Sequence, residues 1–223
     1  MKKLFLFAIL GMIFASCITE QPRFVLTPPG EVDEVVEAPR AFVITDFKNK
    51  DLGLEIPEWA NRFFEDGIFA VRAMETDLDT YVFIARSEGT NFNGLNLWIN
   101  GFNAELNFPR LAASRVQAHF SAGVHFPDAE FGALYETVIR AVSDARWTGA
   151  AREDDFWIRR RFFADAEFPD SEDWEFLILV TIEKIHFSSQ LNSIFANLRP
   201  NPPPTEAQRH AFNRVAERFF DGF

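Results

Sequence analysis

Side chains that could do acid-base or metal chemistry are few and widely spaced in this sequence. The four histidines are His119, His125, His186 and His210. His119 and His125 flank a glycine turn, His186 is expected on a strand, and His210 is expected in a C-terminal helix. Zinc sites use closely spaced ligands, as in H-E-x-x-H, and the sequence contains no such pattern. We therefore expect no metal site.

Motifs of the commonest hydrolases and nucleotide-binding proteins do not occur either. The sequence has no G-x-S-x-G elbow, no G-x-G-x-x-G and no G-x-x-x-x-G-K-[ST]. Asp154-Asp155 and Glu65-Asp66 are adjacent acids, but in a chain with 33 Asp and Glu such pairs are usually solvated turns or strand ends. We predict a non-catalytic protein without a cofactor. Because missing motifs are weak ground against catalysis, an enzyme remains the third hypothesis.

The one cysteine, Cys17, follows a segment with the layout of a secretion signal. Residues 1–3 are positively charged, residues 4–14 are apolar apart from one glycine, and two small residues precede Cys17. A helix that spans a bilayer needs about 20 apolar residues, whereas polarity returns here at Thr19. We therefore predict that residues 1–16 are a signal peptide and that Cys17 begins the mature chain.

The stretch Phe14-Ala15-Ser16-Cys17 resembles the lipobox of bacterial lipoproteins. This resemblance implies diacylglycerol addition to the sulfur of Cys17, cleavage before it, and acylation of the new amino terminus. A single acyl chain binds a membrane only marginally, whereas further chains make a stable anchor. Phe14 stands where the family usually has Leu, and this relaxed form is similar to the lipoboxes of spirochaetes. The alternative is an ordinary secretion signal with a coincidental cysteine.

The charge of the chain limits its partners. Its formal net charge is −11, and loss of Lys2 and Lys3 with the signal makes the mature chain still more acidic. A nucleic-acid-binding protein needs a basic face that displaces counterions from phosphates, so we expect no nucleic-acid partner. The same charge keeps a tethered domain soluble and away from anionic lipid.

Phenylalanine is the unusual feature of the composition, with 27 Phe against 2 Tyr and 3 Met. Its ring has a large apolar area and no polar group, so we expect most of these rings in the core. A Phe-lined pocket for an apolar ligand is the alternative, although such pockets are few per protein. Four tryptophans could either pack in the core or form an exposed contact patch. They are Trp59, Trp98, Trp157 and Trp174.

The composition divides the chain into four parts. After the signal at 1–16, residues 17–40 combine the acylated cysteine with four prolines, which is typical of a semi-extended tether. Residues 41–199 form the globular domain. Residues 200–223 contain a proline-rich break and a C-terminal amphipathic helix that begins with a capping-box spacing.

Hydrophobic periodicity in the globular domain alternates between strand and helix. Helical spacing is expected at 56–67, at 95–120 with an interruption at Pro109, at 128–145 and at 188–198. Strand patterns are expected at 41–47, 68–74, 80–86, 154–163 and 174–187, with 68–74 and 80–86 forming one hairpin. We predict an α+β domain with an antiparallel sheet of about four strands and helices packed on one face.

Four stretches of this domain resemble uncharacterised envelope lipoproteins of spirochaetes. They are "IPEW" at 56–59, Leu97-Trp98-Ile99, "YETVIRAVSDARWTGAAREDDFWIRRRF" at 135–162 and "LILVTIEKI" at 177–185. More distantly, the element order is similar to small bacterial lipoproteins related to the N-terminal domain of flagellar assembly protein T. The resemblance covers residues 41–198 and includes no catalytic signature, so it transfers no functional residue. It implies an envelope interaction role.

The sequence therefore predicts a cell-envelope lipoprotein anchored to a membrane through Cys17. We expect it in the outer membrane, facing the periplasm or the surface, with an interaction or structural role and an envelope protein as its partner. The alternative is a carrier or binder of an apolar ligand. Exposed Trp and Phe would favour the first role, and a deep Phe-lined cavity would favour the second.

Overall fold

The computed structural model describes residues 41–123, 129–164 and 169–198, with a few positions between 203 and 210. These residues belong to the compact unit Val32–Phe223. The predicted signal peptide and tether at 1–40, with Cys17, lie outside the described residues, as does most of the predicted C-terminal helix at 200–223.

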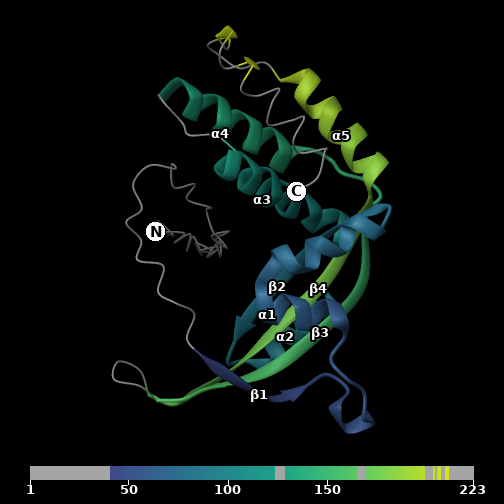
Figure 1. Cartoon of the computed structure of the whole chain (residues 1–223), viewed down its shortest axis with the longest axis vertical. Helices are drawn as coiled ribbons and strands as arrows, with labels where there is room; N and C mark the ends of the chain where they lie inside the picture. The colour runs from purple at the N-terminus through teal and green to yellow at the C-terminus, as the bar shows by residue number, and fades with distance from the viewer. Residues whose placement is uncertain are drawn as a thin grey trace, which may run out of the picture. The chain divides into compact units, whose positions relative to one another are not determined.

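Four antiparallel strands of the described chain form one sheet in the order β1-β3-β4-β2 (Figure 1). The strands are β1 Phe42–Phe47, β2 Thr80–Gly89, β3 Ala151–Phe162 and β4 Ser171–Glu183. β3 and β4 are the long central hairpin that the sequence predicts, and β4 is apolar on both faces, as a central strand should be. The predicted α+β class and strand number are confirmed.

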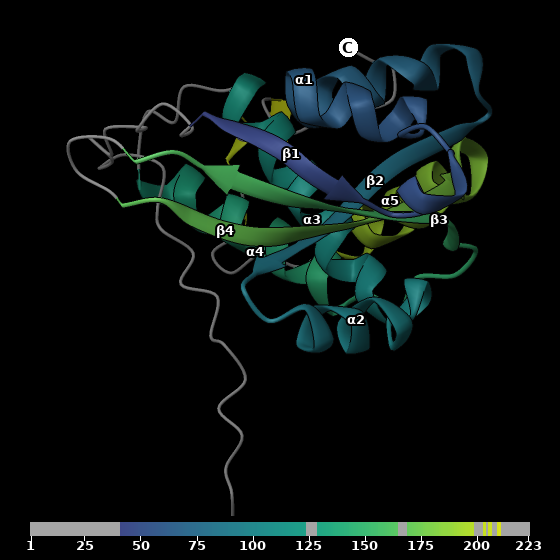
Figure 2. The ribbon, with the colours of Figure 1, turned by 90° about the horizontal axis from the view of Figure 1, so that it is seen from below.

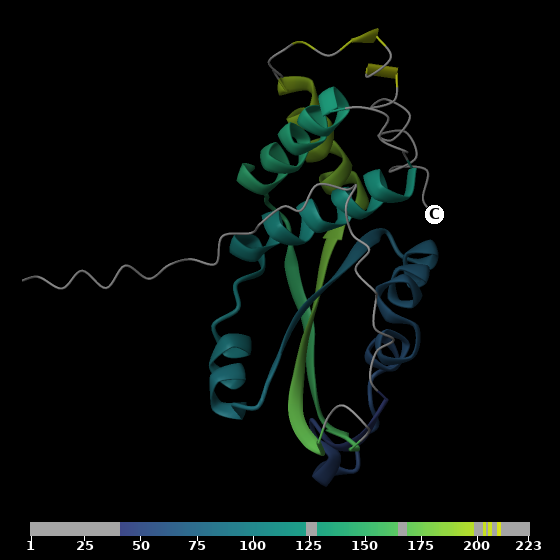
Figure 3. The same cartoon turned by 90° about the vertical axis from the view of Figure 1, so that its left-hand side faces the viewer.

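Helices cover both faces of this sheet. They are α1 Glu58–Arg72, α2 Phe92–Asn100, α3 Ala104–Gly123, α4 Ala129–Asp144 and α5 Lys184–Asn197. α2 to α5 lie on one face, as predicted, and α1 lies on the other (Figures 2 and 3). The position of α1 differs from the prediction because the second face of the sheet is also apolar. Phe156, Ile158 and Leu177 of β3 and β4 lie on that face, and Trp59 of α1 packs against them.

The larger core, under α2 to α5, is built around a group of buried aromatic rings. The ring of Phe108 lies 4.8 Å from Phe83 and 5.4 Å from Trp147, centroid to centroid. Phe187 stacks on Trp147 at 5.0 Å. All four side chains are buried, and each edge-to-face pair adds about 0.5–1.5 kcal/mol beyond its buried area. These phenylalanines have the core role that the sequence favours.

The hairpin predicted from 68–74 and 80–86 is wrong. Residues 68–72 continue α1, and Ala73–Asp77 form a 3-10 helix, while β2 pairs with β4. Val71 and Glu75 are buried four residues apart, which is helical spacing. Gly67, the expected helix end, is instead a kink within α1, with φ 71° and ψ −160°.

Two helix boundaries also differ from the predicted ones. The break between α2 and α3 lies at residues 101–103 rather than at Pro109, because Asn103 caps α3 by accepting a 3.0 Å hydrogen bond from the Leu106 N–H. α5 begins at Lys184, so His186 is helical and not on a strand. Phe187 and Leu191, both buried, give that helix its core-facing side.

Candidate functional site

A groove of about 430 Å³ follows the outer edge of β2. It lies between the last part of α1, on one face of the sheet, and α2 and α3, on the other; Figure 3 shows β2 between these elements. We call it the β2-edge groove. Its aromatic side chains are Phe69, Phe83, Trp98 and Phe102, and its charged side chains are Arg72, Arg86 and Arg110.

The backbone of β2 offers hydrogen-bonding groups to this groove. In an antiparallel pair, successive residues direct both backbone groups alternately toward and away from the neighbouring strand. Glu75 Oε1 accepts a 2.7 Å hydrogen bond from the Val82 N–H, and Arg115 Nη1 donates to the Val82 oxygen at 3.4 Å. Val82 therefore faces away from β4, and by alternation the N–H and C=O groups of Ile84 and Arg86 do so too.

Glu75 and Arg115 occupy the end of this edge at Val82. Arg115 Nη1 and Nη2 contact the two Glu75 carboxylate oxygens at 2.5 and 2.8 Å, and both residues are buried. The guanidinium also lies 4.6 Å from the ring centre of Tyr81 and 5.3 Å from that of Phe83. With the bonds to Val82, this ion pair occupies the position of a neighbouring strand.

A second ion network lies at the other end of this edge, next to Arg86. Arg86 pairs with Glu175 and, at 2.8 Å, with Glu88. Buried Arg160 contacts Glu88, Asp173 and Glu175 at 2.6 to 2.8 Å. The hydrogen bond from Arg160 lowers the pKa of Glu88, while burial raises the pKa of Glu175. The carboxylates of this network are therefore already matched by arginines.

Arg72 differs from these paired arginines. Its Nε is shielded from solvent and has no hydrogen-bond partner within the described chain. Burial, and then the charge of Arg115, lower the pKa of Arg72 to about 10, so it stays charged at neutral pH. Its guanidinium lies 6.0 Å from the ring centre of Phe69. Nearby, burial and the charges of Arg115 and Arg72 lower the pKa of His119 to about 4, which keeps that imidazole neutral.

The side chains that line the β2-edge groove differ in charge from the chain as a whole. Three arginines line it and none of its described lining residues is acidic, although the chain carries a net charge of −11. Arg86 is already paired with Glu88 and Glu175, so Arg72 is the lining cation that would attract an added anionic group.

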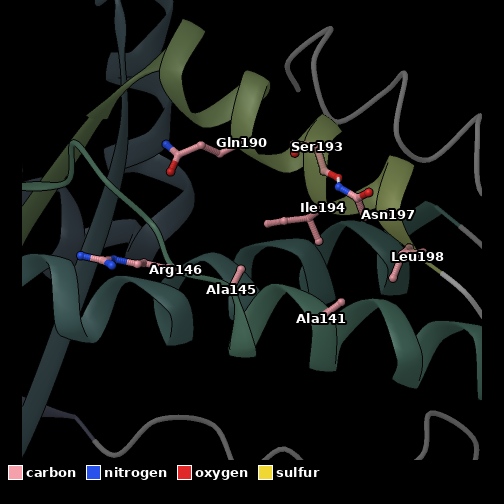
Figure 4. A pocket seen from close by; sticks show the side chains of 8 residues that line it. All are labelled: Ala141, Ala145, Arg146, Gln190, Ser193, Ile194, Asn197 and Leu198. Carbon is pink, nitrogen blue, oxygen red and sulfur yellow. Dashed lines mark hydrogen bonds between the residues drawn. The ribbon is translucent and has the colours of Figure 1, made fainter.

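A second cavity, of about 390 Å³, lies between α4 and α5. Figure 4 shows Gln190, Ser193 and Asn197 of α5 above Ala141 of α4 and above Ala145, the residue that follows α4. Gln190 is already hydrogen-bonded to the loop before β3. Its Nε2 donates to the Thr148 oxygen at 3.0 Å, and its Oε1 accepts from the Thr148 N–H at 2.9 Å. This cavity brings no group of titratable side chains together.

The histidines and the Asp154-Asp155 pair do not form a common site within the described residues. No three His, Cys, Asp or Glu there could hold a metal ion. His119 is buried, His186 and His210 are exposed, and His125 lies outside the described residues. Asp154 accepts a 2.9 Å hydrogen bond from the Trp59 indole, and Asp155 pairs with Lys48 at 2.6 Å, so both have structural roles.

Of the four candidate tryptophans, only Trp98 lines the β2-edge groove, where it is half-buried. Trp59 is buried in the smaller core. Trp157 and Trp174 are half-buried against Phe92, at 5.6 and 4.6 Å. The sequence reasoning missed the three groove arginines. They come from three elements, and only the position of β2 at the sheet edge brings them together.

No protein-family model, curated protein or solved structure matches the chain. The resemblance to spirochaetal lipoproteins therefore remains a prediction. In the part of the chain that is described, no helix has both the length and the apolarity needed to cross a bilayer. The geometry of the β2-edge groove is thus the main guide to function.

Proposed function

We propose that this chain is a cell-envelope lipoprotein, anchored through acylated Cys17, whose folded domain acts by binding another protein rather than by catalysis. The observation that carries the proposal is the β2-edge groove, which combines aromatic walls, arginines and outward-facing strand groups. Aromatic residues and arginine are enriched at protein interfaces and supply most of the binding energy there.

The expected anchor and tether agree with such a role. A tether of the kind expected at 17–40 would let the folded domain meet a partner in the same envelope compartment. We place it in the outer membrane, facing the periplasm or the surface.

The alternative, a carrier of an apolar ligand, has less support. Phe108 and Phe187 pack on each other and on Phe83 in the larger core, and of these three rings only Phe83 also lines the β2-edge groove. A purely apolar ligand in the β2-edge groove would leave Arg72 and the strand groups without partners, and such desolvated polar groups oppose binding.

The first test concerns the anchor. The full chain, expressed in a bacterium that processes lipoproteins, should yield an N-terminal peptide whose Cys17 carries acyl chains in mass spectrometry. Cys17→Ala should move the protein from the membrane fraction to the aqueous fraction. An unmodified Cys17, or a wild-type protein that is freely soluble, would contradict the proposed anchor.

The second test concerns the binding surface. A photo-crosslinking amino acid at Phe69, which is 66% exposed in the groove, should give a discrete protein adduct in intact cells. The matched control is Leu52, which is 73% exposed and near the opposite sheet edge. Equal labelling from both positions, or no adduct from Phe69, would argue against protein binding at the groove.

A further inference from the structure

We propose that the occupant of the β2-edge groove is an extended acidic segment of the partner protein, which pairs with β2 as a fifth strand. This inference rests on the protein-binding role proposed above and specifies the ligand. It follows from three features of the groove: its backbone groups, its limits and its charge.

The backbone groups favour an extended peptide. Ile84 and Arg86 direct their N–H and C=O groups away from β4, and both residues line the groove. A peptide that adds to a sheet edge gains its affinity from such main-chain bonds and its specificity from pockets for alternate side chains. A lipid or another compact ligand would satisfy few of these groups.

The two ends of the groove limit the position and the length of the added strand. At Val82 the Glu75 carboxylate and the Arg115 guanidinium already make the bonds that an added strand would make. Below Arg86, the pairs with Glu88 and Glu175 form the other boundary. The segment between them is short, and at about 3.3 Å per residue it accommodates a strand of only a few residues. We therefore expect a short docking motif rather than a large interface.

The charge specifies the side chains of that motif. Alternate residues of an added strand face α1 on one side and α2 with α3 on the other. A carboxylate facing α1 meets Arg72, whose Nε has no described partner. Apolar side chains on the opposite side meet Trp98 and Phe102. Acidic residues that alternate with Val, Ile or Phe fit this arrangement.

The decisive experiment uses the purified full chain and an array of eight-residue peptides in which Asp or Glu alternates with Val, Ile or Phe. Fluorescence anisotropy of the best binder should show saturable binding that weakens with salt. The matched peptide with Gln in place of Glu should bind at least tenfold more weakly. A peptide with the same side chains but N-methylated at alternate backbone nitrogens should lose affinity similarly.

The protein side has its own controls. Arg72→Gln should weaken binding about tenfold, whereas Arg62→Gln, on an exposed part of α1 where Arg62 pairs with Glu58, should not. Hydrogen exchange gives a readout that does not depend on variants. The amides of Ile84 and Arg86 should become protected on peptide binding. The Val82 amide should change little, because Glu75 already binds it.

Three results would overturn the proposal. Equal binding of the Glu and Gln peptides would remove the acidic requirement, and full binding of the N-methylated peptide would remove strand addition. Peptide binding that appears only after deletion of residues 199–223 would mean that the chain fills its own groove. These failures are distinguishable from failure of the proposed function, because acylation of Cys17 and the Phe69 adduct do not depend on peptide binding.

Discussion

The two edges of the sheet are built differently. At one edge, β1 is six residues long and its register with β3 shifts between Ile44 and Asp46. Lys50 lies beside this edge and donates a 2.8 Å hydrogen bond to the Thr45 oxygen. At the other edge, β2 is ten residues long and pairs with β4 without a shift in register.

This difference indicates that one edge is protected and the other is kept accessible. Short length, a bulge and a lysine are devices by which proteins prevent their edge strands from pairing with other chains. β2 lacks these devices between Val82 and Arg86, where flanking helices and an ion pair limit access instead. An open edge confined in this way admits a narrow, extended ligand and excludes a second sheet. The following changes test the contrast.

The largest effect should come from the ion pair that closes the β2 edge. Arg115→Met leaves the Glu75 carboxylate buried without its cation, and loss of one partner from a buried pair costs about 3–5 kcal/mol. Lys50→Met at the β1 edge removes an exposed lysine and should cost less than about 1 kcal/mol. Urea unfolding of both variants measures the difference. Similar losses for the two variants would mean that the edges do not differ in this way.

Acidification should affect the β2 edge through His119, which is only 7% exposed. The pKa of this group is 6.5 before folding and about 4 in the folded chain. Its contribution to stability is therefore fully present above pH 6.5 and is lost as pH falls toward 4. Over that interval the free energy of unfolding should decrease by about 3 kcal/mol through this group.

The matched comparison for this pH effect uses two histidine variants. His119→Gln should lose stability less steeply between pH 6.5 and 4 than the wild type, whatever its stability at pH 7. His186→Gln changes an exposed histidine and is the matched control. Urea titrations at several pH values provide the slopes, and parallel curves for the wild type and His119→Gln would refute the assignment.

The kink at Gly67 should have the next largest effect, because the segment after it carries Phe69 and Arg72 to the β2 edge. A residue with a β-carbon at φ 71° and ψ −160° is strained by about 1–3 kcal/mol. Gly67→Ala should therefore lower the free energy of unfolding by that amount, although no atom lies within 4 Å of the added carbon. Gly132→Ala in α4 also meets open space, without the strained φ, and should be stabilising by up to about 1 kcal/mol.

Local patterns in the sequence were sufficient for much of the fold. The apolar run of β4 and the helical spacing of α4 predict elements that the structure confirms, since each pattern depends only on nearby residues. The strand predicted for residues 68–74 is wrong because Ile-Phe-Ala-Val fits a strand as well as a helix. With that segment expected to pair with 80–86, the sequence offers no basis for pairing β2 with β4, which lies about ninety residues away.

The candidate site was beyond sequence reasoning for the same physical reason. Arg72, Arg86 and Arg110 occur singly in α1, β2 and α3, and no motif connects them. Their common location depends on which strand ends the sheet, a property of the whole topology. The sequence indicates Trp98 only as one of several candidate aromatic side chains and contains no sign that it lies beside arginines.

The smallest expected effect concerns Arg72 and has the opposite sign. Burial lowers the pKa of Arg72 to about 10, so the folded state disfavours its charged form, and the charge costs stability at pH 7. Arg72→Met keeps most of the apolar stem and removes the charge, and it should raise the free energy of unfolding by about 1 kcal/mol once solvent screening is allowed for. The same variant should bind the acidic peptide about tenfold more weakly. Gains in stability that accompany losses of function mark residues retained for binding rather than for folding. If Arg72→Met instead destabilises the chain by more than about 2 kcal/mol, Arg72 is structural, and the β2 edge loses its distinction from the β1 edge.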